Sequence, residues 1–159
     1  MRLQMLEPLL ATNGKRPPAP AIAPGRSSDE ATRLETRVLI VEDEMMIAWM
    51  IESLLSDAGF ENVAIAADGK EACRQASEQT PGLVVSDINL GSGINGVEAA
   101  VAICHAGRIP VLFVTAYADG ATRERIAAHF PHAELLRKPV DGASLTAAVH
   151  RALEFRHGN

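Results

Sequence analysis

Short runs of branched apolar residues alternate with longer amphipathic stretches from residue 38 onward. The runs at 38–41, 62–67, 82–87, 109–115 and 133–137 are rich in Val, Ile and Leu, which predicts strands. The stretches at 45–59, 68–80, 95–107, 121–130 and 143–155 have the apolar spacing of helices. Gly59 is suited to end the first of these helices, and Asp68 is suited to cap the second.

The alternation of these elements predicts the fold class. The strands are almost continuously apolar, which is typical of a parallel sheet that is covered by helices on both faces. Crossover connections between parallel strands are right-handed, so the sheet is doubly wound. We therefore expect an α/β fold with a doubly wound five-stranded parallel sheet and five helices.

The first 36 residues differ from the rest of the chain. They contain five of the nine prolines, and such a composition buries too little apolar surface to offset the entropy of ordering. We expect a flexible Pro/Ala-rich tail over residues 1–36, with a short helix over Met1–Leu10 as an option, and a folded domain over residues 37–157.

Composition excludes several classes of protein. The 159 residues are 47% hydrophobic and carry a net charge of -5, which argues against binding nucleic acid through phosphates. No apolar run reaches the ~18 residues of a membrane span, so no membrane association and a cytoplasmic location are expected. Cys73 and Cys104 are expected to be reduced thiols, and the five histidines show no metal-ligand spacing. Residues 38–104 contain 2 basic and 11 acidic residues, so this part of the chain is the place to look for a bound cation.

Polar side chains follow four of the five predicted strands. Glu42 and Asp43 follow the first, Asp87 ends the third, Thr115 ends the fourth, and Lys138 follows the fifth. Each has an ordinary explanation when taken alone, such as an acidic helix start or an exposed lysine before a proline. However, the carboxyl ends of parallel strands meet at one edge, where ligands bind such sheets. The sequence therefore predicts one site with three carboxylates, a hydroxyl and an ammonium.

The chemistry of this group suits a phosphoryl transfer. Clustered carboxylates repel one another unless a hard dication neutralises them, and Mg²⁺ prefers oxygen ligands. A carboxylate beside the metal can attack phosphorus and form an acyl phosphate. A lysine ammonium and a hydroxyl can stabilise the charge of the phosphoryl oxygens.

The motifs VEDE, SDIN, FVTAY and RKP, in this order and spacing, resemble the receiver domain of two-component response regulators, over about residues 37–155. The resemblance implies a flavodoxin-like fold and a phosphoprotein in which Asp87 is the phosphoacceptor. It implies that Asp43 binds Mg²⁺ directly, that Glu42 acts largely through water, and that Asp87 and the backbone carbonyl of Asn89 complete the protein ligands.

The same resemblance implies that Thr115 and Lys138 bind the phosphoryl oxygens and that the Lys138–Pro139 bond is cis. Leu135 stands where most receivers have an aromatic switch residue, so Thr115, Tyr117 and Leu135 are the residues to examine for the switch. The fourth strand with Tyr117 resembles the Phe-Ala-Thr-Gly-Tyr subfamily of small alphaproteobacterial regulators, although Ala116 replaces the usual glycine. The loop LGSGINGVE is glycine-rich and longer than is usual.

Two functions remain open within this family. One is a phosphorylation-dependent switch that signals by protein contact, with Thr115 moving inward and Tyr117 or the loop after Asp87 carrying the change. Its surface would be the helix 121–130, the strand 133–137 and the helix 143–155, with a group of arginines on these elements or directly after them: Arg123, Arg125, Arg137, Arg151 and Arg156. The alternative is a phosphate sink or a shuttle to a histidine phosphotransferase, in which Tyr117 would hinder the attacking water.

The expected partners are a sensor histidine kinase or a histidine phosphotransferase, a protein target, and a second copy in a homodimer. The chain ends soon after the last helix, so a stand-alone receiver without an output domain is expected. Its chemistry would be limited to Mg²⁺-dependent self-phosphorylation and autodephosphorylation. A doubly wound enzyme of another class is disfavoured, because the acids after the first strand would repel an anion and no glycine-rich phosphate loop is present there.

Overall fold

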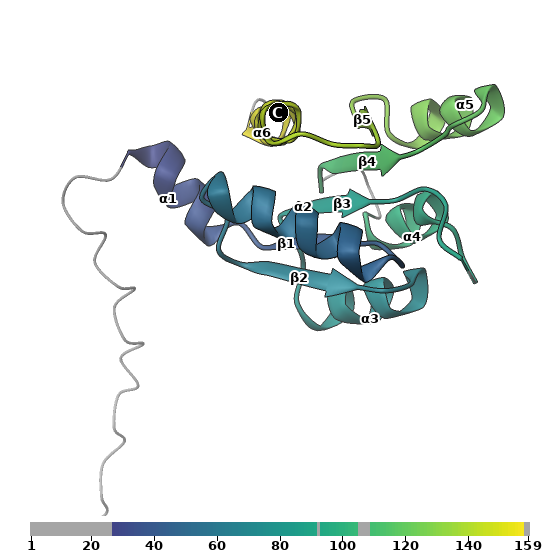
Figure 1. Cartoon of the computed structure of the whole chain (residues 1–159), viewed down its shortest axis with the longest axis horizontal. Coiled ribbons are helices and arrows are strands. Elements are labelled where there is room, and N and C mark those ends of the chain that lie inside the picture. The colour runs from purple at the N-terminus through teal and green to yellow at the C-terminus, as the bar shows by residue number, and fades with distance from the viewer. Residues whose placement is uncertain (1–26, 92, 105–108, 158–159) are drawn as a thin grey trace, which may run out of the picture.

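The computed structural model describes residues 27–91, 93–104 and 109–157. In these ranges a five-stranded parallel sheet has the order β2-β1-β3-β4-β5 (Figure 1). The strands are β1 (Val38–Val41), β2 (Val63–Ala66), β3 (Leu83–Ser86), β4 (Val111–Thr115) and β5 (Glu134–Arg137). The helices are α1 (Ser28–Glu35), α2 (Met45–Asp57), α3 (Gly69–Glu78), α4 (Gly96–Ile103), α5 (Gly120–His129) and α6 (Gly142–His157).

Two hydrophobic cores lie on opposite faces of this sheet. Alternate residues of β1, such as Val38 and Ile40, point to the face that is covered by α2 and α6. Their neighbours Leu39 and Val41 point to the face that is covered by α3, α4 and α5. The central strands β1, β3 and β4 are buried along their whole length, as expected of strands that are covered on both faces. The predicted fold class is therefore confirmed.

The helix ends follow from local chemistry. Gly59 adopts a φ of 93° just after α2, a conformation that glycine adopts without a steric penalty. The Asp68 carboxylate accepts a hydrogen bond from the Glu71 N–H at 2.8 Å and caps α3, as the sequence predicts. No helix within the described ranges is both long and apolar enough to span a membrane.

The number of helices differs from the prediction, because α1 forms within the segment that was expected to be a flexible tail. The Ser27 hydroxyl caps α1 by accepting a hydrogen bond from the Glu30 N–H, and Asp29 lies in its first turn. No residue of α1 is fully buried, and its only apolar residues are Ala31 and Leu34, so its apolar pattern is too short to predict a helix. The short helix considered for Met1–Leu10 lies outside the described residues.

Candidate functional site

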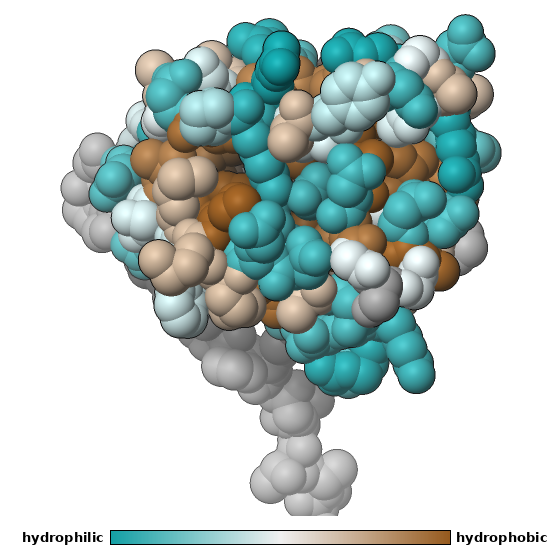
Figure 2. All heavy atoms as spheres, turned by 45° about the vertical axis from the view of Figure 1, so that its right-hand side comes forward, coloured by the Kyte–Doolittle hydropathy of each residue, from teal (hydrophilic) through white to brown (hydrophobic). Residues whose placement is uncertain are grey.

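The backbone pairing of the sheet continues one residue past the strand ends and places the polar side chains there. The Asp87 N–H donates to the Val41 carbonyl at 2.8 Å, and the Lys138 N–H donates to the Thr115 carbonyl at 2.9 Å. The residues after β1, β3 and β5 are thus held at the same edge as the end of β4. Figure 2 turns this edge toward the reader and shows hydrophilic side chains in its middle, with more hydrophobic surface to the left.

A buried cluster of charges forms the centre of this edge. The Lys138 Nζ donates to Glu42 Oε2 at 2.7 Å and to Asp87 Oδ2 at 2.8 Å. The side chains of Lys138, Glu42 and Asp87 are only 13%, 1% and 8% exposed. Three side chains that are far apart in the sequence are therefore paired away from solvent.

The burial of this cluster changes its proton affinities. Burial raises the pKa of Glu42, and hydrogen bonds from Lys138 and from the Glu44 N–H oppose part of this rise. Burial lowers the pKa of Lys138, but hydrogen bonds to Asp87 and Glu42 outweigh it, so its pKa is raised overall. The ammonium form of Lys138 is therefore favoured.

Asp43 adds a third carboxylate to the cluster. Oxygen atoms of Glu42, Asp43 and Asp87 lie within 4.8 Å of one another. Asp43 is exposed, and its Oδ2 accepts a hydrogen bond from the Gly91 N–H at 2.9 Å. Three carboxylates and one ammonium carry a formal charge of minus two, which a divalent cation would balance. This all-oxygen donor set fits Mg²⁺, with two carboxylates in the interior and one open to water.

Thr115 lies at the end of β4 and is 2% exposed. Its hydroxyl donates to the Tyr117 carbonyl at 2.9 Å and accepts a hydrogen bond from the Asn89 side-chain amide at 3.2 Å. The Asn89 N–H donates to Asp87 Oδ1 at 3.1 Å. The hydroxyl group is therefore connected to Asp87 through Asn89.

The residues expected to take part in switching occupy different surroundings. The Tyr117 side chain is 70% exposed, whereas Leu135 is half-buried and packs against the core under α3, α4 and α5. Neither side chain joins the charged cluster. The Lys138–Pro139 peptide bond is cis, the geometry that the resemblance implies.

The first residue of α4 packs tightly against the end of β3. A Cβ atom on Gly96 would overlap the carbonyl oxygen of Asp87, so only glycine fits without moving the backbone. Asn95 and Glu98 form a capping box at the same helix end. These contacts hold α4 close to the backbone of Asp87. Sequence reasoning missed this role of Gly96, because a close approach between two backbones leaves no local pattern.

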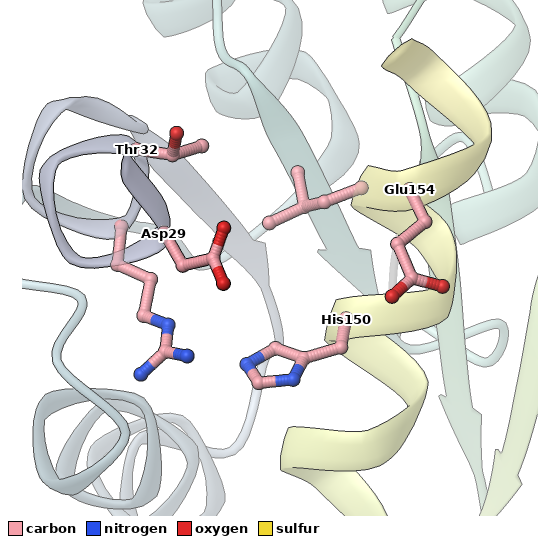
Figure 3. Close-up of a pocket in the computed structure, with 6 residues that line it drawn as sticks. Asp29, Thr32, His150 and Glu154 are labelled. Atoms are coloured by element: carbon pink, nitrogen blue, oxygen red, sulfur yellow. The ribbon is translucent and has the colours of Figure 1, made fainter. Parts of the chain in front are cut away.

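A second group of polar side chains lies apart from this edge, in a cavity of about 140 Å³ between α1 and α6. Figure 3 shows the His150 ring extending from α6 toward α1, with Asp29 extending from α1 into the same space. The His150 Nε2 is buried and has no hydrogen-bond partner among the described residues. No residue of this cavity belongs to the acidic edge.

Comparisons with known proteins agree on one family. The family model described as the response regulator receiver domain matches residues 38–150. The phyllosphere-induced regulator PhyR of Methylorubrum extorquens is 36% identical over 80% of this chain and 49% of its own length. The transcriptional regulatory protein PdtaR of Mycobacterium tuberculosis is 31% identical over 81% of this chain and 62% of its own length. The chain thus spans only about half to three fifths of these relatives.

Solved structures support the same assignment. The receiver (REC) domain of the PhyR response regulator from Erythrobacter litoralis is 31% identical and matches 78% of this chain and 94% of its own length, with a TM-score of 0.65. The anti-anti-sigma factor PhyR from Bartonella quintana is 31% identical, with a TM-score of 0.66 over 81% of this chain and 51% of its own length. The family model covers more than half of the chain, and this protein belongs to the response regulator receiver domain family.

Proposed function

We propose that this protein is a phosphorelay response regulator that accepts a phosphoryl group on Asp87. The observation that carries the proposal is the position of Lys138 Nζ, which is 2.8 Å from Asp87 Oδ2 and 2.7 Å from Glu42 Oε2. Carboxylate oxygens of Glu42, Asp43 and Asp87 also lie within 4.8 Å of one another. A small phosphorylated molecule or a phosphohistidine on a kinase or phosphotransferase would be the donor.

The transfer would proceed by attack of a carboxylate oxygen of Asp87 on phosphorus. The new O–P bond forms as the P–N bond to the donor histidine breaks, and the imidazole leaves with the bonding electron pair and takes up a proton from solvent. Lys138 stabilises the negative phosphoryl oxygens, and the Thr115 hydroxyl would donate to one of them. Asp43, Asp87, the Asn89 carbonyl and, through water, Glu42 would hold Mg²⁺, which supplies charge neutralisation when it is bound.

Chemical labelling tests this proposal directly. Phosphoramidate with Mg²⁺ should phosphorylate the wild-type protein, and the product should be labile to hydroxylamine, as an acyl phosphate is. The Asp87→Asn variant should take up no label, because an amide is a poor nucleophile. Asp57→Asn, at the exposed end of α2, is the matched control and should be labelled like the wild type. Label that persists in Asp87→Asn would overturn the assignment.

The output of the receiver is proposed to be a protein contact through α5, β5 and α6. Of the arginines expected there, Arg125 pairs with Glu98 and Arg151 pairs with Glu134, so part of this positive charge is already paired within the chain. The side chain of Arg156 lies outside the described side chains. The PhyR protein of Bartonella quintana is described as an anti-anti-sigma factor, which favours a regulatory protein as the target. We expect this contact to take place in the cytoplasm, where ATP can supply the phosphoryl group.

The switch can be separated from a phosphate sink by measurement. For the switch, amide chemical shifts of α5 should change when beryllium trifluoride and Mg²⁺ are added as a phosphoryl mimic. A sink or shuttle would instead show an acyl phosphate that decays within seconds to minutes, with no change at α5. If Tyr117 hinders the attacking water, then Tyr117→Ala should shorten the lifetime of the acyl phosphate. An unchanged lifetime would remove that role from Tyr117.

A further inference from the structure

The side chain of Asn89 joins two loops at the acidic edge. Its Nδ2 is 3.2 Å from Thr115 Oγ1 and 3.2 Å from the carbonyl oxygen of Tyr117. A carbonyl oxygen can only accept a hydrogen bond, so the group that faces Tyr117 is the amide NH₂ and not the amide oxygen. This NH₂ group therefore contacts both Thr115 and Tyr117 at the end of β4.

The hydroxyl of Thr115 is fully engaged by the same network. It donates its single hydrogen to the Tyr117 carbonyl at 2.9 Å and accepts from the Asn89 amide and from the Tyr117 N–H at 3.3 Å. Within the described residues, no hydrogen bond joins this hydroxyl to Asp87. To donate to a phosphoryl oxygen on Asp87, the hydroxyl has to release the Tyr117 carbonyl. This carbonyl also accepts a hydrogen bond from the Asn89 amide, so the move breaks up a group of three residues that are bonded to one another.

The main chain of Asn89 connects this network to the phosphoacceptor. Its N–H donates to Asp87 Oδ1 at 3.1 Å, two residues along the same loop. One residue thus contacts Asp87 through its backbone and contacts Thr115 and Tyr117 through its side chain. A change of charge at Asp87 acts directly on the segment that carries the amide group.

We propose that the Asn89 side chain is a latch that stabilises the resting position of Thr115 and of the backbone at Tyr117. This role rests on the proposed function, because the latch has an effect only if Asp87 receives a phosphoryl group. The latch lowers the fraction of molecules that can offer the Thr115 hydroxyl to the phosphoryl group, and so it weakens apparent phosphoryl binding. Asn89 acts through Thr115 and is a positioning residue.

A different role for Asn89 would have the opposite effect. If its amide donated to the phosphoryl oxygens themselves, removal of the amide would weaken the binding of a phosphoryl mimic. If its amide served only the general stability of the loop, removal would change the unfolding midpoint without changing the rotamer of Thr115. The latch therefore predicts tighter binding of the mimic, a direct contact predicts weaker binding, and a purely structural role predicts an unchanged Thr115 rotamer.

The first measurement concerns the resting protein and needs no phosphoryl group. Three-bond couplings to the Thr115 methyl group report its side-chain rotamer by NMR. The wild type should show one rotamer, and Asn89→Ala should show averaging between rotamers. Gln75→Ala is the matched control, because the Gln75 amide also donates to a backbone carbonyl, that of Ile65, at 2.9 Å. Ile65 belongs to β2, the edge strand at the opposite end of the sheet from β5. Rotamer averaging should be absent in this control.

The second measurement is the affinity for beryllium trifluoride in the presence of Mg²⁺. Asn89→Ala should bind the mimic roughly threefold to tenfold more tightly than the wild type, since two hydrogen bonds of the resting state are removed. Asn89→Leu keeps the approximate shape of the side chain without its donors and should show the same gain in affinity. It therefore separates the loss of the hydrogen bonds from the effect of the space that alanine leaves empty.

Unchanged or weaker binding of the mimic in both variants, or a single Thr115 rotamer in Asn89→Ala, would overturn the latch. A wild-type protein that binds no mimic would count against the proposed function. The rotamer measurement would still decide whether Asn89 holds Thr115, so the two failures are distinguishable.

Discussion

Charged side chains form pairs of two kinds in this molecule. At the carboxyl edge of the sheet, Lys138 is buried between Glu42 and Asp87. On the outer surface, Arg151 contacts Glu134 while 54% of its side chain stays exposed, and Arg125 and Glu98 are 46% and 41% exposed. The distances are similar, between 2.7 and 3.1 Å. The pairs differ in their exposure to solvent, and this exposure determines how much each pair contributes to the stability of the fold.

Burial makes the first kind of pair hard to disturb. Charges that are removed from water need partners, and loss of one partner leaves an uncompensated charge in the interior. Exposed pairs exchange their partner for water at little cost. The acidic edge therefore differs from the ordinary surface in the burial of its charges. The proposed metal and phosphoryl site would use this buried surplus of carboxylates.

Replacement of Lys138 should give the largest change in stability. Lys138→Met leaves Glu42 and Asp87 buried without their shared cation, and we expect a loss of about 3–5 kcal/mol in the free energy of unfolding at neutral pH without added metal. Urea denaturation measures this. Lys70→Met, at an exposed position of α3, is the matched control and should change stability by less than about 0.5 kcal/mol. Equal effects of the two substitutions would break the distinction between buried and exposed charges.

Two glycines at the first position of a helix allow a finer test. Gly96→Ala at α4 should destabilise the protein by about 1–3 kcal/mol, because the added Cβ overlaps the Asp87 carbonyl oxygen. Gly120→Ala at α5 meets no atom within 4 Å and should be neutral or stabilising by about 0.4–1 kcal/mol. Thermal unfolding and phosphoramidate labelling, measured together, should show that only Gly96→Ala affects the site. A neutral Gly96→Ala would mean that α4 does not need its close contact with β3.

The sequence was sufficient to predict the residues at the strand ends. Strands that are apolar along most of their length favour a parallel sheet covered on both faces. Parallel pairing then places Asp43, Asp87 and Lys138 at one edge, whatever their distance in the sequence. The Asp68 cap and the turn at Gly59 could also be predicted from the sequence, because each depends on one residue and its immediate neighbours. Their roles in phosphoryl transfer remain predictions for the experiments above.

Other features could not be read from the chain alone. The helix α1 has only two apolar residues, Ala31 and Leu34, and its start motif at Ser27 and Glu30 is a weak signal beside so short an apolar pattern. The contact of the Asn89 amide with Thr115 and Tyr117 depends on side-chain rotamers and on the path of two loops. The closeness of Gly96 to Asp87 depends on the packing of a helix against a strand end. Such features arise from three-dimensional packing and leave no periodic pattern.

The exposed pair between Arg151 and Glu134 should give the smallest effect. The hydrogen bond from Arg151 lowers the pKa of Glu134, so the pair stabilises the folded state above the ordinary pKa of a glutamate and loses this contribution as the pH falls through the lowered value. Arg151→Ala should therefore shift the unfolding midpoint slightly at pH 7, less in high salt, and not at all once Glu134 is protonated in both states. A shift at pH 7 as large as that of Lys138→Met would show that exposure does not separate the two kinds of pair. A shift that persists in strong acid would instead come from packing of the arginine stem against β5.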